Sequence, residues 1–317
     1  MDWSKTAFVF PGQGSQDVGM GADLIRTFPE AEATFALADE VLGFSLSNLC
    51  FNGPAELLND TLNTQPALYV TGIALLRVLN AAFEDELRPA FVAGHSLGEF
   101  TALTAAGALN FTDGLRLVRE RGRLMNEAGK RAPGSMAAIL GLEADVVREI
   151  CAQASQQTGQ PLVLANDNCS GQLVISGEKA TLELALPLAT ERGAKKTIIL
   201  PVSVASHSPL MQAITPDFRQ VLQNTPFTAP AIPVVGNVQA APLATVEAIQ
   251  TELSDQLTST VRWTESVQYM EAHGVDTYIE LGPKEVLTGL IKRISRSARR
   301  INLHQSESVI SFLATEA

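Results

Sequence analysis

The stretch Phe91-Val-Ala-Gly-His-Ser-Leu-Gly-Glu99 places one serine between a short apolar run and a helix-forming segment. The apolar run is typical of a buried strand, and the Ala- and Leu-rich residues 99–109 favour a helix. The five residues from Gly94 to Gly98 match the G-x-S-x-G nucleophile elbow, a sharp strand-to-helix turn that exposes a serine hydroxyl. We therefore predict that Ser96 is a nucleophile at the carboxyl end of a strand.

The neighbours of Ser96 fit such a turn. Gly94 and Gly98 leave room where side chains would collide, and the serine of such a turn often has a strained backbone. The N–H of Leu97 opens the following helix, so it has no partner within the helix and lies at the positive end of the helix dipole. A small-residue turn without chemistry is the alternative for a lone match, but the strand before and the helix after favour the nucleophile.

Composition limits the class of protein. The chain has 317 residues, of which 46% are hydrophobic and 18% charged, enough for one large domain or a large and a small one. A net charge of −11 argues against nucleic acid as a partner, and a small anionic substrate would need a local cationic group. Cys50, Cys151 and Cys169 lack metal-ligand spacing, so we expect reduced thiols and no metal site. The N-terminus lacks a signal-peptide pattern and no apolar run has membrane length, so we expect a cytoplasmic protein.

The first part of the chain alternates between strand and helix patterns. The expected elements are a strand at 7–10, helical segments at about 18–42 and 54–60, a long helix starting at Thr64-Gln-Pro66, a strand at 90–93 and a helix at 98–108. This order predicts an open parallel α/β sheet, in which ligands bind beyond the carboxyl ends of the strands. The loop Pro11-Gly-Gln-Gly-Ser-Gln16 lacks the third glycine of a dinucleotide fingerprint. Its glycines instead leave main-chain amides free to donate close to a ligand.

The pattern changes from Gly134 onward. The expected order is strand 136–141, helix 143–156, strands 161–165 and 172–176, helix 178–192 and strand 195–200, which is that of a ferredoxin-like unit. We interpret Asn166-Asp-Asn168 as the turn between the middle strands. The predicted fold class is therefore α/β, with an α/β-hydrolase-like large domain of residues 1–130 and 199–317, containing a parallel sheet, and an inserted small ferredoxin-like domain of residues 131–198.

Arg121 carries a charge in an unexpected place. It lies on a helix expected to start at Thr112 or Asp113 and to end near Glu127, and it projects from the apolar half of that helix. An unpaired guanidinium there would cost free energy. Either Arg121 forms a buried structural ion pair, or its planar fork recognises an anion.

A base for Ser96 must come from one of four histidines. His95 is the immediate neighbour of Ser96 and points elsewhere at a sharp turn, while His273 and His304 lie at a helix end and in a polar tail segment. His207 lies among small residues between a strand and a helix, which makes it the candidate by elimination. A capping or core histidine is the alternative.

Five cations lie within nine residues near the end of the chain. They are Lys292, Arg293, Arg296, Arg299 and Arg300. A solvated helix end is the usual explanation of such a run, because cations there are favoured by the helix dipole. Docking of an acidic partner is the alternative.

Taken together, these motifs resemble those of the malonyl-CoA:acyl-carrier-protein transacylases of fatty-acid synthesis and the related polyketide acyltransferase domains. The similar segments follow the family order and cover nearly the whole chain. They are Phe10-Pro-Gly-Gln-Gly-Ser-Gln16, Thr64-Gln-Pro-Ala-Leu68, Gly94-His-Ser-Leu-Gly-Glu99, Arg121-Gly122 with Met125, Val204-Ala-Ser-His207 with Met211, Gln256, and Glu280-Leu-Gly-Pro283.

The resemblance implies a role for each site residue. Ser96 would be the acylated nucleophile and His207 its base, oriented by the main-chain carbonyl of Gln256 in place of a carboxylate. The backbone N–H groups of Gln13 and Leu97 would form the oxyanion hole. Arg121 would bind the free carboxylate of a malonyl group, and Gln65 and His95 would support these residues. Two departures, Ala205 and the Cys-Ser-Gly that follows Asn168 where many members carry proline, bear on the shape of the acyl pocket more than on the chemistry.

The implied reaction is ping-pong acyl transfer without a metal or redox cofactor. Malonyl-CoA would be the donor and the phosphopantetheine thiol of an acyl carrier protein the acceptor, with the five-cation run as a docking surface. We expect neither nucleic acid nor membrane as a partner, and a monomer. The alternatives are a serine hydrolase or thioesterase, a polyketide-pathway acyltransferase that takes malonyl or methylmalonyl groups, and a non-catalytic subunit that docks a carrier protein.

Overall fold

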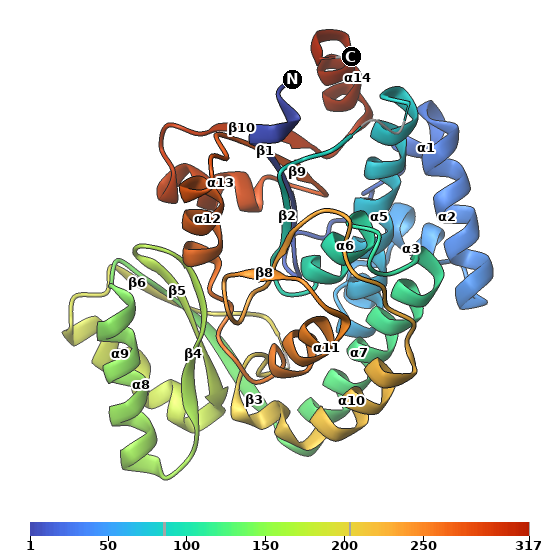
Figure 1. Cartoon of the computed structure of the whole chain (residues 1–317). Helices are drawn as coiled ribbons and strands as arrows, with labels where there is room; N and C mark the ends of the chain where they lie inside the picture. The colour runs from blue at the N-terminus through green and yellow to red at the C-terminus, as the bar shows by residue number, and fades with distance from the viewer. Residues whose placement is uncertain (85–86, 203, 317) are drawn as a thin grey trace.

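The computed structural model describes residues 1–84, 87–202 and 204–316, and two sheets organise them (Figure 1). The larger sheet has six strands in the order β10-β9-β1-β2-β7-β8, and the smaller has four in the order β4-β5-β3-β6. The larger sheet consists of β1 (Thr6–Phe10), β2 (Phe91–Gly94), β7 (Val234–Val235), β8 (Pro242–Leu243), β9 (Thr277–Leu281) and β10 (Arg299–Leu303). The smaller sheet consists of β3 (Gly134–Leu140), β4 (Leu162–Cys169), β5 (Gln172–Glu178) and β6 (Lys196–Ile199).

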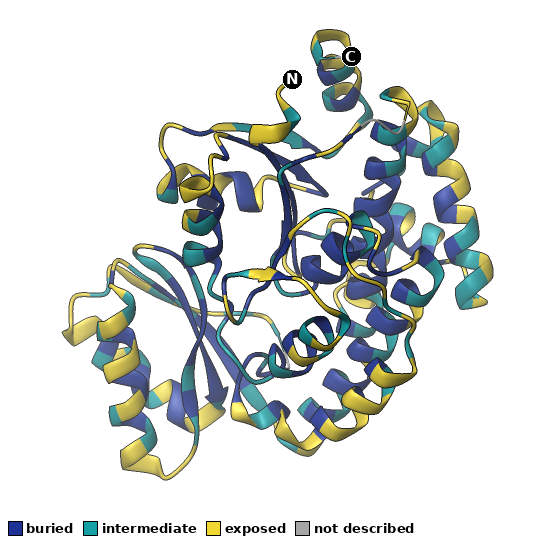
Figure 2. Ribbon diagram, viewed as in Figure 1, coloured by how far each residue is buried: buried dark blue, intermediate teal, exposed yellow. Residues whose placement is uncertain are grey.

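Strand β1 lies inside the larger sheet and pairs in parallel with both β2 and β9. All of its residues are buried, as are those of β2 and β9, which agrees with helices covering both faces of the sheet (Figure 2). Only the short β8 is antiparallel to its neighbour, β7, among the described strand pairs of this sheet. The predicted α/β class with a parallel sheet is confirmed.

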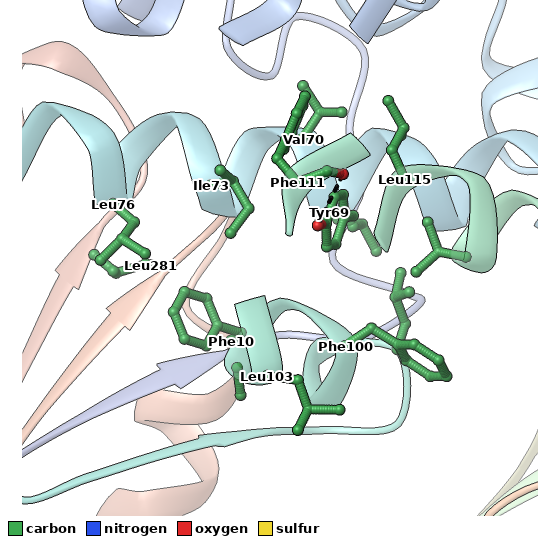
Figure 3. Packing of buried hydrophobic residues seen from close by; sticks show 14 of the residues in the cluster. Phe10, Tyr69, Val70, Ile73, Leu76, Phe100, Leu103, Phe111, Leu115 and Leu281 are labelled. Atoms are coloured by element: carbon green, nitrogen blue, oxygen red, sulfur yellow. Dashed lines mark hydrogen bonds between the residues drawn. The ribbon is translucent and has the colours of Figure 1, made fainter. Parts of the chain in front are cut away.

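Alternate residues of β1 face different cores, because successive side chains of a strand point to opposite faces. Phe8 and Phe10 pack with the helices of the first half of the chain, and Figure 3 shows Phe10 below the long helix that carries Ile73 and Leu76. Ala7 and Val9 pack instead with two helices near the C-terminus.

The described helices are α1 (Leu24–Thr27), α2 (Pro29–Leu42), α3 (Leu46–Asn52), α4 (Ala55–Leu58), α5 (Thr61–Ala82), α6 (Gly98–Ala105), α7 (Phe111–Arg131), α8 (Ala144–Thr158), α9 (Lys179–Glu191), α10 (Thr215–Asn224), α11 (Val246–Asp255), α12 (Trp263–Ala272), α13 (Val286–Ile294) and α14 (Ser306–Glu316), with short 3-10 helices at η1 (Trp3–Lys5) and η2 (Pro209–Ile214).

Helix α5 starts earlier than predicted. The side chain of Asp60 accepts a hydrogen bond from the N–H of Leu62 at 2.9 Å and caps the helix, so Pro66 lies inside it rather than in its first turn. A proline at this place leaves the carbonyl of Leu62 without its helical donor, and Arg119 Nη1 lies 3.5 Å from that oxygen. The prediction of a start at Thr64-Gln-Pro66 is therefore wrong.

Helix α7 also has a different cap. Asn110 accepts a hydrogen bond from the N–H of Asp113 at 2.9 Å, so the helix begins at Phe111 and neither Thr112 nor Asp113 caps it. The rest of the helix pattern places Arg121 among buried residues, as the sequence predicts.

The smaller sheet has the strand order of a ferredoxin-like fold, and α8 and α9 cover one of its faces (Figure 1). Its β4 is longer than predicted and includes Asn166 and Asn168, while the turn lies at Ser170-Gly171. The turn interpretation of Asn166-Asp-Asn168 is wrong, because this end of β4 continues as a strand. It lies beside the segment that contains Val261, and the N–H of Asp167 donates to the carbonyl of Val261 at 2.9 Å. The domain boundaries at residues 131 and 198 stay a prediction.

The end of the chain contains more regular structure than predicted. Arg299 and Arg300 start strand β10, which pairs in parallel with β9, so only part of the cation run lies at a helix end. Helix α14 follows, beyond His304. In residues 1–84, 87–202 and 204–316, no helix combines the length and the apolar character needed to cross a membrane.

Candidate active site

Ser96 lies in a tight turn between β2 and α6. Its φ is +51°, in the left-handed region that non-glycine residues rarely adopt. A Cβ on Gly94 would lie 1.8 Å from the carbonyl carbon of Gly98, and a Cβ on Gly98 would lie 1.9 Å from the carbonyl oxygen of Phe10. The two glycines are therefore required for the close approach of the turn to itself and to β1, and the strained serine projects its hydroxyl outward.

His207 contacts Ser96 from a segment more than a hundred residues away. Its Nε2 lies 2.9 Å from Ser96 Oγ, and its Nδ1 lies 2.7 Å from the main-chain carbonyl of Gln256. Because a carbonyl can only accept, Nδ1 carries the proton and Nε2 is free to accept the proton of the serine hydroxyl. Burial, together with the charge of Arg121, lowers the pKa of His207 to about 3, so the imidazole is neutral at physiological pH.

Arg121 lies next to the same hydroxyl and is only 2% exposed. Its Nη2 is 3.2 Å from Ser96 Oγ and donates to Gln256 Oε1 at 2.8 Å, and its Nη1 donates to Gln65 Oε1 at 2.8 Å. These acceptors are neutral, and among the ion pairs of the described residues none includes Arg121. The interpretation as a buried structural ion pair is therefore wrong.

The charge of Arg121 survives its burial. Desolvation lowers the pKa of the guanidinium to about 10, against a smaller opposing effect of Glu99, and the group stays protonated at neutral pH. Its Nε is buried and makes no hydrogen bond to any described group. The site thus holds a desolvated cation whose hydrogen-bonding capacity is incompletely used, an arrangement suited to an incoming anion.

Gln13 and Leu97 lie beside Ser96 in the wall of the same cavity. Within the described ranges, the N–H groups of both residues donate to no protein acceptor. Gly12 allows this approach, because a Cβ there would lie 2.4 Å from the carbonyl oxygen of His95. Two free amides next to a serine hydroxyl can stabilise an oxyanion that forms at that point.

The cavity over Ser96 has a volume of about 630 Å³ and lies between the two sheets. One wall carries the residues just described, and the opposite wall comes from the face of the smaller sheet that α8 and α9 leave uncovered. That second wall includes Met136, Ala138, Asn166, Asn168, Gln172 and Val174. The smaller sheet therefore covers one side of the site and limits access of water to it.

The remaining predicted residues divide into those at the site and those away from it. His95 lines the cavity, but its Nε2 lies 2.7 Å from Asn168 Oδ1, so it supports the wall rather than the hydroxyl. Gln65 also bonds to Met125 Sδ at 3.3 Å through its Nε2, which fixes its oxygen toward Arg121. His273 bonds to the carbonyl of Tyr269 and, like His304, does not line the cavity. Within the part of the chain that the structure describes, no three His, Cys, Asp or Glu side chains are grouped to hold a metal ion.

Sequence reasoning missed two buried residues beneath the Ser96 turn. Asn237 lies in an irregular segment after β7, where nothing in the local pattern distinguishes it from a loop residue. Glu99 belongs to the Gly94–Glu99 motif, but a glutamate in the first turn of a helix has an ordinary explanation in the helix dipole. Only the fold brings Asn237 into contact with Glu99, and Glu99 into contact with Gln256.

The fold and the Ser96–His207 pair place the chain in the class of α/β proteins that carry a serine nucleophile on a strand-to-helix turn. A family profile described as acyl transferase domain matches residues 7–310. The chain therefore belongs to the acyl transferase domain family, as the resemblance of its motifs implies.

Individual relatives agree over nearly the full length. The malonyl CoA-acyl carrier protein transacylase of Escherichia coli (strain K12) is 46% identical over 291 residues, which cover 92% of this chain and 93% of that protein. The protein of the same name from Bacillus subtilis (strain 168) is 44% identical over 306 residues, covering 96% and 95%.

Solved structures are similar as well. An acyl carrier protein S-malonyltransferase from Vibrio cholerae, at 44% identity, superposes with a TM-score of 0.92 over 97% of this chain and 99% of that one. A type II PKS acyl-carrier protein in complex with its malonyl-transacylase, at 42% identity, gives 0.94 over 98% and 100%.

The buried, neutral state of His207 predicts an unusual pH profile for acylation of Ser96 by a thioester. For an imidazole with the ordinary pKa of 6.5, the fraction in the free-base form would fall about 30-fold from pH 7.5 to pH 5. His207 stays in the free-base form over this range. We expect single-turnover acylation rates at the two pH values to agree within about threefold. A sigmoid centred near pH 6.5 would contradict this geometry.

Stability supplies the control for this experiment. In the same pH window the unfolded chain binds a proton at residue 207 that the native state does not, so the free energy of unfolding falls on acidification. Enzyme returned from pH 5 to pH 7.5 must therefore regain its full rate before the profile is attributed to the base.

Proposed function

We propose that this chain transfers the malonyl group from malonyl-CoA to the phosphopantetheine thiol of an acyl carrier protein. The observation that carries this proposal is the Arg121 guanidinium, which is buried, lacks a carboxylate partner and lies 3.2 Å from Ser96 Oγ. An acyl group held on Ser96 with a free carboxylate at its other end would provide the missing anion. The names of the similar proteins, malonyl CoA-acyl carrier protein transacylases, support the same substrate pair.

In the first half-reaction, His207 Nε2 accepts the proton of Ser96 Oγ as the oxygen attacks the thioester carbonyl of malonyl-CoA. The carbonyl of Gln256 holds the resulting imidazolium through Nδ1–H. The tetrahedral oxyanion lies against the amides of Gln13 and Leu97. The C–S bond then breaks, His207 returns the proton to the CoA sulfur, and the malonyl group remains on Ser96 as an oxygen ester.

The second half-reaction runs the same steps in the opposite direction. The phosphopantetheine thiol gives its proton to His207 Nε2 and its sulfur attacks the ester carbonyl, and the same amides receive the oxyanion. The C–O bond breaks, the proton returns to Ser96 Oγ, and malonyl carrier protein leaves. Every bond in this sequence forms or breaks between a serine oxygen, a thiol and an acyl carbon, so we propose that no cofactor takes part.

Two alternatives use the same nucleophile. A serine hydrolase normally orients its histidine with a carboxylate, whereas Nδ1 of His207 meets a main-chain carbonyl. It also has no need of the desolvated Arg121. An acyltransferase of a polyketide pathway, taking malonyl or methylmalonyl groups, would use the same residues and differ in the acyl pocket or the carrier protein. A non-catalytic docking subunit would need neither Ser96 nor His207.

The cellular compartment and the oligomeric state of the chain are also part of the proposal. Cys50, Cys151 and Cys169 are all buried and free, which fits a reducing compartment, and we place the protein in the cytoplasm. We retain the expectation that it acts as a monomer.

We further propose that the carrier protein docks on the basic surface at the end of α13. Lys292, Arg293, Arg296 and Arg300 surround a surface hollow together with Ser170. The preceding turns of α13 line the active-site cavity through Leu287 and Leu290, so the hollow adjoins that cavity. Arg299 differs from the other four, because it pairs with Glu316 at 2.7 Å.

Replacing Arg121 tests the substrate assignment. We expect Arg121→Ala to lower kcat/KM for malonyl transfer by about 2–5 kcal/mol of transition-state stabilisation, while acetyl transfer from acetyl-CoA stays similar or improves. Arg116→Ala is the matched control, because Arg116 lies on the same helix with a side chain that is 63% exposed. An equal loss for malonyl and acetyl groups would contradict a carboxylate-binding role for Arg121.

Charge reversal tests the docking surface. We expect Arg296→Glu to raise the KM for the carrier protein by about tenfold, and to weaken its dependence on salt, because steering of an acidic partner is lost. Acylation of Ser96 by malonyl-CoA should stay unchanged. Arg148→Glu, at an exposed position on α8, is the control. Equal KM values for the two variants would remove this surface from the proposal.

A further inference from the structure

A buried polar cluster lies beneath the Ser96 turn, and none of the proposed chemical steps uses it. Glu99 is 0% exposed and Asn237 1% exposed. Burial of a carboxyl and an amide without partners would cost free energy, so their contacts indicate what they do. Both side chains bond to the Ser96 turn or to its neighbours, and neither lines the cavity.

Asn237 bonds to both sides of the turn with one amide. Its Oδ1 accepts the N–H of Ser96 at 2.6 Å, and its Nδ2 donates to the carbonyl of Gly94 at 2.7 Å. A planar amide fixes the two contacts relative to each other, since donor and acceptor share one plane. Because Ser96 has a φ of +51°, its backbone needs such external contacts to stay in place.

Glu99 joins this turn to the support of the base. Its Oε2 accepts the N–H of Asn237 at 3.3 Å and the Nε2 of Gln256 at 2.8 Å. The same Nε2 lies 3.1 Å from the carbonyl of Ser96. Gln256 is thereby held so that its main-chain carbonyl meets His207 and its Oε1 meets Arg121.

We propose that Asn237 and Glu99 are positioning residues that fix the Ser96 turn and Gln256 relative to each other. A single buried network then positions the nucleophile, its base and the guanidinium. This inference rests on the proposed function, which takes Ser96 as the nucleophile. Three groups from distant parts of the chain must be held in the productive geometry, because a misplacement of about 1 Å can cost about 100-fold in rate.

Oε2 of Glu99 acts in this network as a hydrogen-bond acceptor, for the N–H of Asn237 and the Nε2 of Gln256. Burial and the neighbouring Glu252 raise its pKa well above the ordinary value, and Arg121 opposes this only weakly. Its other oxygen, Oε1, is buried and makes no hydrogen bond to a described group. A glutamine amide oxygen in place of Oε2 should therefore preserve both contacts.

The test uses variants that keep the shape of the side chain. Asn237→Asp keeps the acceptor for the N–H of Ser96 but places an oxygen against the carbonyl of Gly94. Glu99→Ala removes the acceptor for Gln256, and Glu99→Gln restores it. Tyr278→Phe is the matched control, because it removes one buried hydrogen bond, from the hydroxyl to the carbonyl of Val267, away from the cavity.

Two readouts distinguish positioning from stability. One is kcat and KM for malonyl transfer, and the other is the rate at which a small uncharged sulfonyl fluoride modifies Ser96, which needs the Ser96–His207 pair but not Arg121. We expect Asn237→Asp and Glu99→Ala to lower kcat and the sulfonylation rate by about 10- to 100-fold with little change in KM. Glu99→Gln and Tyr278→Phe should stay within about threefold of the parent.

The contrary outcomes are equally specific. A folded Asn237→Asp that is sulfonylated at the parent rate would overturn the role of Asn237, and Asn237→Ser provides the same comparison where Asn237→Asp fails to fold. A Glu99→Gln as slow as Glu99→Ala would overturn the acceptor role. These outcomes can be distinguished from a failure of the proposed function, because in that case the parent enzyme itself would form no malonyl ester on Ser96.

Discussion

The Arg121 guanidinium is withdrawn from water with only amide oxygens and a hydroxyl as hydrogen-bond partners. A charge in such surroundings destabilises the empty protein, and the surrounding structure must hold it there. Helices α5 and α7 supply that rigidity, because Gln65 from one and Arg121 from the other meet within a tightly packed interface. Burial and, to a smaller extent, the same positive charge keep His207 neutral.

The parallel sheet brings the rest of the site to this point. The loop after β1 carries Gln13 and the turn after β2 carries Ser96, and both lie at the same edge because neighbouring parallel strands end together. The smaller sheet covers that edge with a mixed face, on which Met136 and Val174 lie beside Asn166 and Asn168. In the proposed reaction, this cover limits the access of water to an ester on Ser96, which favours transfer over hydrolysis.

Most of the fold and much of the site follow from the sequence, for physical reasons that also explain the misses. The elbow motif predicts the place of Ser96 because only glycines tolerate the contacts at positions 94 and 98. Periodicity marks Arg121 because a charge on an apolar face is conspicuous. It cannot reveal Asn237, whose role arises only when β7 lies beside β2. Asp60 and Asn110 cap their helices through local contacts, but both helices offer a second polar cap candidate a few residues later, and local pattern does not choose between them. The turn predicted at Asn166 is wrong because local propensity does not include the long-range contact of β4 with Val261.

The central claim is that Ser96 carries a malonyl group between two thiols. The most direct measurement is the intact mass of the protein after incubation with malonyl-CoA in the absence of a carrier protein, followed by peptide mapping. The account predicts one malonyl group per chain, located on Ser96, absent from Ser96→Ala and removed on addition of a phosphopantetheine thiol. Rapid release of free malonate without an accumulated ester, or an ester on another residue, would contradict it.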